Sequence, residues 1–99
     1  MTDKIYQISE IKDIVSPIAR QYGADRIYLF GSYAKGTPTA NSDIDLRIDK
    51  GKIKGMFAMS GLRLDLIDKL GKNVDLLTTG SLDDDFLSRI RKEEILIYG

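Results

Sequence analysis

The N-terminal part of the chain carries a hydrophobic pattern that predicts a helix. Apolar side chains recur every three or four residues between Ser9 and Tyr22, which is the spacing of one helical face. Ser9 is of a type that often caps a helix N-terminus, and Gly23 is of a type that often ends a helix. Pro17 lies inside the pattern, and because proline lacks an amide hydrogen we expect it to kink the helix or split it in two.

The following segments predict two strands separated by a polar loop. Residues 26–30 form a short apolar run that leads directly into a Gly-Ser pair, and residues 33–35 fit one helical turn. The Gly, Pro, Thr and Asn residues of 36–41 indicate a loop. Residues 42–49 alternate between polar and apolar side chains, which is typical of a strand with one buried face.

The C-terminal half predicts two helices and a third strand. A basic loop over residues 50–55 precedes an apolar stripe of helical spacing over residues 56–70, which Gly71 ends. The remaining elements are a strand over residues 73–78, a helix from its cap Ser81 to about residue 92, and a terminal extended piece over residues 94–98.

This order of elements predicts one α/β domain over residues 1–99, with a small mixed β-sheet packed against helices. A chain of 99 residues can bury one modest core and has no room for a separate substrate domain. Any substrate larger than a small ligand must therefore bind to an open face of the domain or be presented by a partner protein.

The amino-acid composition limits which side chains could carry out acid–base or metal chemistry. The chain has no Cys and no His, so acid–base or metal chemistry falls to carboxylates. Its 15 basic and 15 acidic residues give a net charge of zero, which argues against a dedicated nucleic-acid binder. No apolar run approaches the length of a membrane span or a signal sequence, and we expect a cytoplasmic protein.

The Gly-Ser pair has the features of a phosphate site. A strand that leads into Gly31 and Ser32 presents backbone N–H groups and a hydroxyl at the start of a helical turn, where an anion is favoured. Gly31 lets a phosphate approach the backbone, and Lys35 adds a nearby cation. The alternative is a plain turn with an ordinary helix cap and a solvated lysine.

Two aspartates of the second strand form a candidate metal site. Residues two apart in a strand share a face, so Asp43 and Asp45 place two carboxylates side by side. They repel each other unless a cation or a proton lies between them, and Mg²⁺ prefers such hard oxygen ligands. The alternative is the solvated face of an edge strand, shared by Asp43, Asp45, Arg47 and Asp49.

Two further acidic segments are interpreted differently. Asp75 lies within an otherwise apolar strand, where burial of a carboxylate without a partner is expensive, so we expect it to complete a two-metal triad unless it occupies a strand edge or end. Asp83, Asp84 and Asp85 follow Ser81 directly, and we assign them to helix capping.

The chain resembles the minimal nucleotidyltransferases (MNT) of the polymerase-β-like superfamily. The resemblance rests on the Gly31-Ser32 pair, the ten-residue gap, the Asp43-x-Asp45 pair and the third aspartate, Asp75, and it extends over nearly the whole chain. The chain is most similar to the MNT antitoxins that pair with HEPN-domain ribonucleases in toxin–antitoxin modules. The resemblance implies a palm-like nucleotidyltransferase fold.

The resemblance also implies roles for these residues. Gly31 and Ser32 would hold the β- and γ-phosphates of ATP, and Asp43, Asp45 and Asp75 would bind two Mg²⁺ ions. The implied reaction transfers AMP to a tyrosine hydroxyl of the HEPN toxin, with Asp75 as the candidate general base. Arg47 departs from the apolar residue that many family members carry there, and it could neutralise Asp45, contact triphosphate or pair with Asp49.

Three functions remain open at this point. The first is the AMP-transferring antitoxin. The second is an antitoxin that neutralises its toxin by contact alone, for which Leu64, expected to be exposed, and the lysines of residues 50–54 would offer a surface. The third is nucleotidyl transfer to a small molecule or an RNA 3′ end, which fits less well with the small size and the zero net charge. The sequence leaves open whether the chain forms a homo-oligomer.

Overall fold

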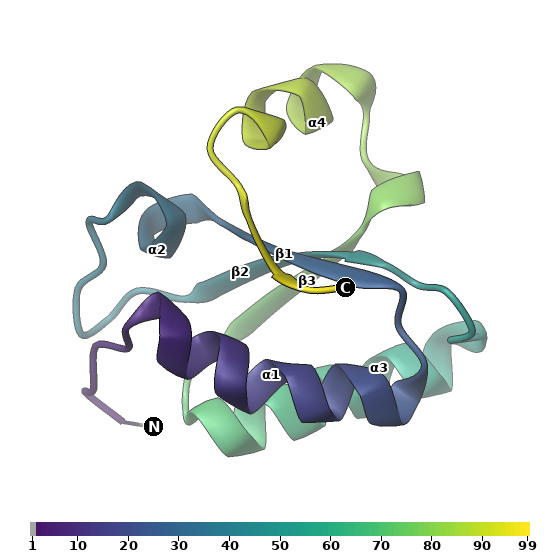
Figure 1. Ribbon diagram of the computed structural model, residues 1–99, viewed down its shortest axis with the longest axis horizontal. Coiled ribbons are helices and arrows are strands. Elements are labelled where there is room, and N and C mark those ends of the chain that lie inside the picture. The colour runs from purple at the N-terminus through teal and green to yellow at the C-terminus, as the bar shows by residue number, and fades with distance from the viewer. Residues whose placement is uncertain (1) are drawn as a thin grey trace.

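A four-stranded sheet separates two layers of helices. The computed structural model describes residues 2–99. Helices α1 and α3 cover one face of the sheet, and α4 lies over the other (Figure 1). In chain order the elements are α1 (Ile8–Tyr22), β1 (Arg26–Phe30), α2 (Gly31–Lys35), β2 (Ile44–Asp49), α3 (Gly55–Leu70), β3 (Val74–Thr78), the 3₁₀ turn η1 (Thr79–Ser81), α4 (Asp84–Arg91) and β4 (Ile95–Tyr98).

The sheet is mixed, as the sequence predicted. Its strand order is β3-β2-β1-β4. Strand β1 pairs antiparallel with both β2 and β4, and β2 pairs parallel with β3. The predicted α/β fold with a small mixed sheet is therefore confirmed.

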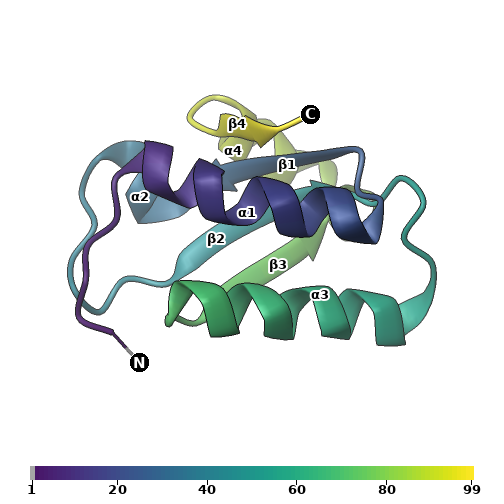
Figure 2. The same ribbon diagram turned by 60° about the horizontal axis from the view of Figure 1, so that its bottom comes forward.

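The hydrophobic core lies between the sheet and the helix pair α1 and α3, which run side by side in Figure 2. The apolar half of the alternating strand β2 faces this layer, and Ile44, Leu46 and Ile48 have no exposed surface. The other half of the alternation, which includes Asp45 and Arg47, therefore faces the side of α4. Within residues 2–99, no helix combines the length and apolar character that crossing a bilayer requires.

The expected cap of α1 was wrong, and the split allowed for at Pro17 does not occur. The helix begins at Ile8 with Gln7 as its cap, and the Gln7 backbone N–H donates to the Glu10 carboxylate at 2.9 Å; Ser9 already lies in the first turn. The helix also continues through Pro17 without a split. Pro17 and Asp13 are both exposed, so water can satisfy the Asp13 carbonyl that loses its amide partner to proline.

The cap of α4 also differs from the prediction. Ser81 belongs to the turn η1, and Asp83 is the N-cap, with its carboxylate accepting a hydrogen bond from the Phe86 N–H at 2.8 Å. Asp84 and Asp85 occupy the first turn, where negative charge suits the helix dipole. The assignment of this acidic run to capping is confirmed, with the cap two residues later than expected.

Arg47 anchors the layer opposite the core. Its side chain is only 3% exposed and donates to both carboxylate oxygens of Glu94, at 2.9 and 2.6 Å, and to the Thr79 hydroxyl at 2.8 Å. Its guanidinium stacks 4.0 Å from the centre of the Tyr28 ring. The hydrogen bonds to Glu94 raise the pKa of Arg47, with the charges of Glu94 and Asp49 adding to them. Arg47 thus joins β2 to the start of β4.

We predict that Glu94→Gln destabilises the fold strongly. The substitution removes the closer of the two carboxylates that pair with the buried Arg47 cation and leaves only Asp49, 3.5 Å away, which costs about 3 kcal/mol. Arg26→Gln is the control, because the ion pair of Arg26 with Asp49 is 3.6 Å long and exposed, and its loss costs less than about 1 kcal/mol. Urea unfolding of both variants measures the difference, and equal small losses would contradict a structural role for the Arg47–Glu94 pair.

Candidate active site

Strand register brings the two halves of the predicted site into one row. Phe30, the last residue of β1, pairs with Asp45 of β2, and Asp45 pairs in turn with Asp75 of β3. Residues from three strands therefore lie side by side across the sheet. Gly31 follows Phe30 directly, so the predicted phosphate end and the predicted metal end meet at Asp45.

Gly31 touches the Asp45 carboxylate through its backbone. Its φ is +73°, a value that side-chain-bearing residues rarely adopt, and a Cβ added to it would lie 2.0 Å from Asp45 Oδ2. A side chain at position 31 would therefore displace the carboxylate. The glycine is required here by its neighbour as well as by its own backbone conformation.

The environment of Asp45 disfavours its charged form. Partial burial raises the pKa of Asp45 to about 6, with further contributions from a hydrogen bond shared with the Asp75 carboxyl and from the negative charges of Asp75 and Asp43. Repulsion and desolvation act in the same direction. A cation at this position would relieve both.

The three aspartates differ in position. Asp75 is exposed on β3, which is an edge strand. This is the alternative that the sequence left open for Asp75. The argument that its carboxylate needs a partner because it is buried therefore does not hold. The closeness of Asp75 to Asp45 remains. Asp43 is exposed and immediately precedes β2. Within residues 2–99, no three His, Cys, Asp or Glu side chains converge closely enough to hold a metal ion as they stand.

The predicted phosphate ligands flank Gly31 in different ways. Ser32 is half-buried at the start of α2, and its hydroxyl has no side-chain hydrogen bond within the described part of the chain. Lys35 is exposed and lies 3.6 Å from the Glu93 carboxylate. The cation expected to meet a phosphate is therefore paired with the segment between α4 and β4 in this structure.

Lys72 holds the loop that leads to Asp43, and sequence patterns did not reveal it. Its side chain is 3% exposed, and its ammonium donates to the carbonyl oxygens of Ala40, at 2.9 Å, and Thr2, at 3.2 Å. A lone lysine between a helix end and a strand reads as solvated, so only the fold reveals this contact. Lys72 and Asp43 line one small hollow of about 200 Å³.

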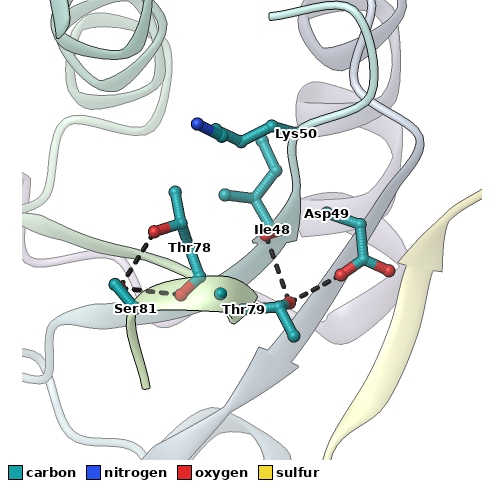
Figure 3. Close-up of a pocket in the computed structure, with 7 residues that line it drawn as sticks. Ile48, Asp49, Lys50, Thr78, Thr79 and Ser81 are labelled. Atoms are coloured by element: carbon teal, nitrogen blue, oxygen red, sulfur yellow. Dashed lines mark hydrogen bonds between the residues drawn. The ribbon is translucent and has the colours of Figure 1, made fainter. Parts of the chain in front are cut away.

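A larger hollow lies at the other end of the same strands. It measures about 550 Å³ and is lined by residues 48–50 and 78–81, none of which was a predicted site residue. Figure 3 shows that its hydroxyl groups bind one another and their neighbours: Thr79 donates to the Asp49 carboxylate and the Ile48 carbonyl, and Thr78 and Ser81 are hydrogen-bonded to each other. The hydroxyl groups of this hollow are satisfied internally, and the candidate site therefore remains at Asp45.

Proteins of similar sequence carry adenylyltransferase names. A relative from Methanocaldococcus jannaschii, whose name gives it as a candidate protein adenylyltransferase, is 36% identical over 88 residues, covering 89% of this chain and 95% of the relative. Protein adenylyltransferase MntA of Thermococcus cleftensis is 27% identical over 94 residues, covering 91% and 95%.

Solved structures share the fold. A chain of a toxin–antitoxin crystal structure with AMP-PNP matches with a TM-score of 0.77 and 27% identity, covering 89% of this chain and 73% of that one. A minimal nucleotidyltransferase structure matches with a TM-score of 0.78 and 25% identity, covering 91% and 95%.

The family model described as polymerase beta, nucleotidyltransferase, matches residues 12–99. That range contains the Gly31-Ser32 turn and the three aspartates Asp43, Asp45 and Asp75. The resemblance seen in the sequence is thereby confirmed, and this chain belongs to the polymerase β nucleotidyltransferase family.

Proposed function

We propose that this protein is an antitoxin that transfers AMP from ATP to a tyrosine hydroxyl of a HEPN-type toxin. The observation that carries the proposal is the contact between the Gly31 backbone and the Asp45 carboxylate, with Asp75 in the next strand. A group able to bind phosphate and a group able to bind metal are thus neighbours, as transfer of a nucleotide requires.

The relatives support both the donor and the partner. One similar chain comes from a toxin–antitoxin structure with AMP-PNP, an ATP analogue. Another, at 25% identity and a TM-score of 0.73, belongs to a toxin–antitoxin structure that contains MntA. The nucleotidyltransferase family match takes up residues 12–99, and a partner protein that presents the hydroxyl fits this arrangement.

The residues present fit two Mg²⁺ ions. Asp43, Asp45 and Asp75 offer only hard carboxylate oxygens, and the raised pKa of Asp45 reflects a repulsion that a cation would relieve. Bound Mg²⁺ would supply charge stabilisation at the attacking and leaving oxygens.

The chain's own residues then position the reacting groups and accept the proton that the acceptor hydroxyl releases. Gly31 N–H and the Ser32 hydroxyl would hold the terminal phosphates of ATP. The acceptor oxygen bonds to the α-phosphorus while the bond from that phosphorus to the β-phosphate oxygen breaks, and pyrophosphate leaves. The hydroxyl proton passes to the Asp75 carboxylate, which stands exposed at the sheet edge.

Label transfer tests this function directly. The purified protein is incubated with ATP labelled at the α-phosphate, Mg²⁺ and the HEPN-type toxin from the adjacent gene, and we expect a labelled toxin whose mass rises by one AMP unit. Asp43→Asn should lower the rate at least a hundredfold. Protection of cells by an Asp43→Asn, Asp45→Asn double variant would instead favour neutralisation by contact alone.

Gly31→Ala should abolish AMP transfer through a clash that a matched control lacks. Gly31 and Gly36 have similar φ values, +73° and +77°, but a Cβ at Gly36 would meet nothing within 4 Å. Both substitutions should lower stability by about 1 kcal/mol through backbone strain. Only Gly31→Ala should reduce transfer by two orders of magnitude or more, and equal activities would show that the contact with Asp45 is dispensable.

Asp45→Asn should stabilise the metal-free protein while it abolishes activity. The folded-state pKa of Asp45, about 6, lies above its ordinary value of 3.8. The wild type therefore loses stability relative to the Asn variant as the pH rises from about 4 to above 6. For this half-exposed group we expect a gain of about 1 kcal/mol at pH 7.5, and almost none near pH 4.

Thermal unfolding in a chelator measures that gain. Addition of Mg²⁺ should raise the melting temperature of the wild type and leave that of Asp45→Asn unchanged, because only the wild type binds the ion. A variant that is less stable than the wild type at pH 7.5 without Mg²⁺ would contradict the repulsion at Asp45.

A further inference from the structure

Helix α3 carries apolar side chains on two opposite faces. Leu62, Leu66 and Leu70 are fully buried against the sheet. Phe57 and Leu64 are 96% and 60% exposed, and because they lie two helical turns apart they share the face that points away from the core. The outer face of α3, defined here by Phe57, Ser60 and Leu64, therefore carries an apolar stripe in water.

Such a stripe is unusual on a helix with nothing over it. A helix that is apolar on both sides is normally covered on both sides, and large exposed apolar groups gathered on one face mark sites of association. Figure 2 shows α3 along the margin of the molecule with no other element over its outer side. Met56, which is 84% exposed, extends the apolar surface at the N-terminal end.

We propose that a second copy of this chain covers the stripe, with the two α3 helices packed antiparallel about a two-fold axis. An axis that passes between Ser60 and Gly61 places Phe57 of each copy opposite Leu64 of the other. The exposed Ser60 lies at the crossing point, and its small side chain does not hold the two helices apart there. The stripe is thus complementary to itself, as an isologous interface requires.

The charges around the stripe fit the same arrangement. Lys54 directly precedes α3, and Asp68 lies in its last turns on the outer side. Both are exposed, and neither forms an ion pair within residues 2–99. The antiparallel arrangement brings Lys54 of each copy near Asp68 of the other, whereas a parallel one would bring like charges together.

The stripe fits an anionic surface less well. The exposed lysines of residues 50–54 would attract an anionic surface, but Asp65 and Asp68, in the same half of the helix as Leu64, would repel it, whereas a second copy offers charges of both signs. A helix of 16 residues is about 24 Å long, so the interface is small. We therefore expect a dimer that dissociates on dilution.

This dimer would leave both reaction sites open. The apolar half of β2 faces α1 and α3, and Asp45 faces the opposite side of the sheet. The outer face of α3 and the aspartates thus lie on opposite sides of the molecule. Each copy could meet its own acceptor protein while paired with the other.

Sedimentation over a range of concentrations tests the dimer. We expect the wild type to pass from monomer to dimer as its concentration rises, and Phe57→Asp or Leu64→Asp to raise the dissociation constant at least tenfold. Ile5→Asp is the control, because Ile5 is also 50% exposed but lies outside α3, and it should dimerise as the wild type does. A wild type that stays monomeric up to millimolar concentration would overturn the proposal.

A charge exchange tests the antiparallel geometry. Lys54→Asp and Asp68→Lys should each weaken the dimer at least threefold, and the double variant should regain wild-type affinity within about twofold. The antiparallel arrangement would be wrong if the double variant did not regain the affinity of the wild type. It would also be wrong if Phe57→Asp left the dissociation constant of the dimer unchanged. Loss of toxin binding in Phe57→Asp, with no self-association of the wild type, would assign the stripe to the toxin instead.

Discussion

The position of Asp45 is the constraint on which the candidate site depends. Its carboxylate lies against the backbone of Gly31 on one side and beside Asp75 on the other. The alternation of β2 fixes this orientation, because burial of Ile44 and Leu46 turns Asp45 to the opposite face. A slip of one residue in register would point Asp45 into the core and separate it from both neighbours.

The next charged residue of β2, Arg47, differs from Asp45 because its charge is paired within the fold. Arg47 follows Asp45 on the same face, but its charge is met within the fold by Glu94 and its stacking partner is Tyr28. Asp45 has only other acids near it, which raise its pKa instead of lowering it. One position is thus satisfied internally and stabilises the fold, while the other is left unsatisfied and available to a ligand.

Local patterns were sufficient for the main helices and strands and for the closeness of Gly31 to Asp45. Strand alternation, helix spacing and the Gly-Ser turn each depend on neighbours within a few residues, and β1 was predicted from Arg26 to Phe30 as the structure has it. The closeness of Gly31 to Asp45 could be expected from consecutive strands joined by a short loop. These features were predictable because their causes lie close together in the chain.

The features that were missed have distant causes. Arg47 and Glu94 are 47 residues apart, and no local pattern pairs them. Lys72 reaches back to Thr2 and Ala40, again across contacts that only the fold creates. The place of Asp75 on an edge strand depends on the strand order, so its exposure could not be inferred from the apolar residues around it.

The two faces of the sheet have different roles. One face has to admit ligands, and the other has to supply the buried apolar surface that stabilises the fold. In the proposed reaction a nucleotide and an acceptor hydroxyl have to reach Asp45 and Asp75, so the face of α4 must stay partly open. Its apolar burial is therefore limited, and stability has to come from the layer of α1 and α3. A second copy packed on α3 would extend that layer and add burial without covering the aspartates, so association would stabilise the fold at no expense to access.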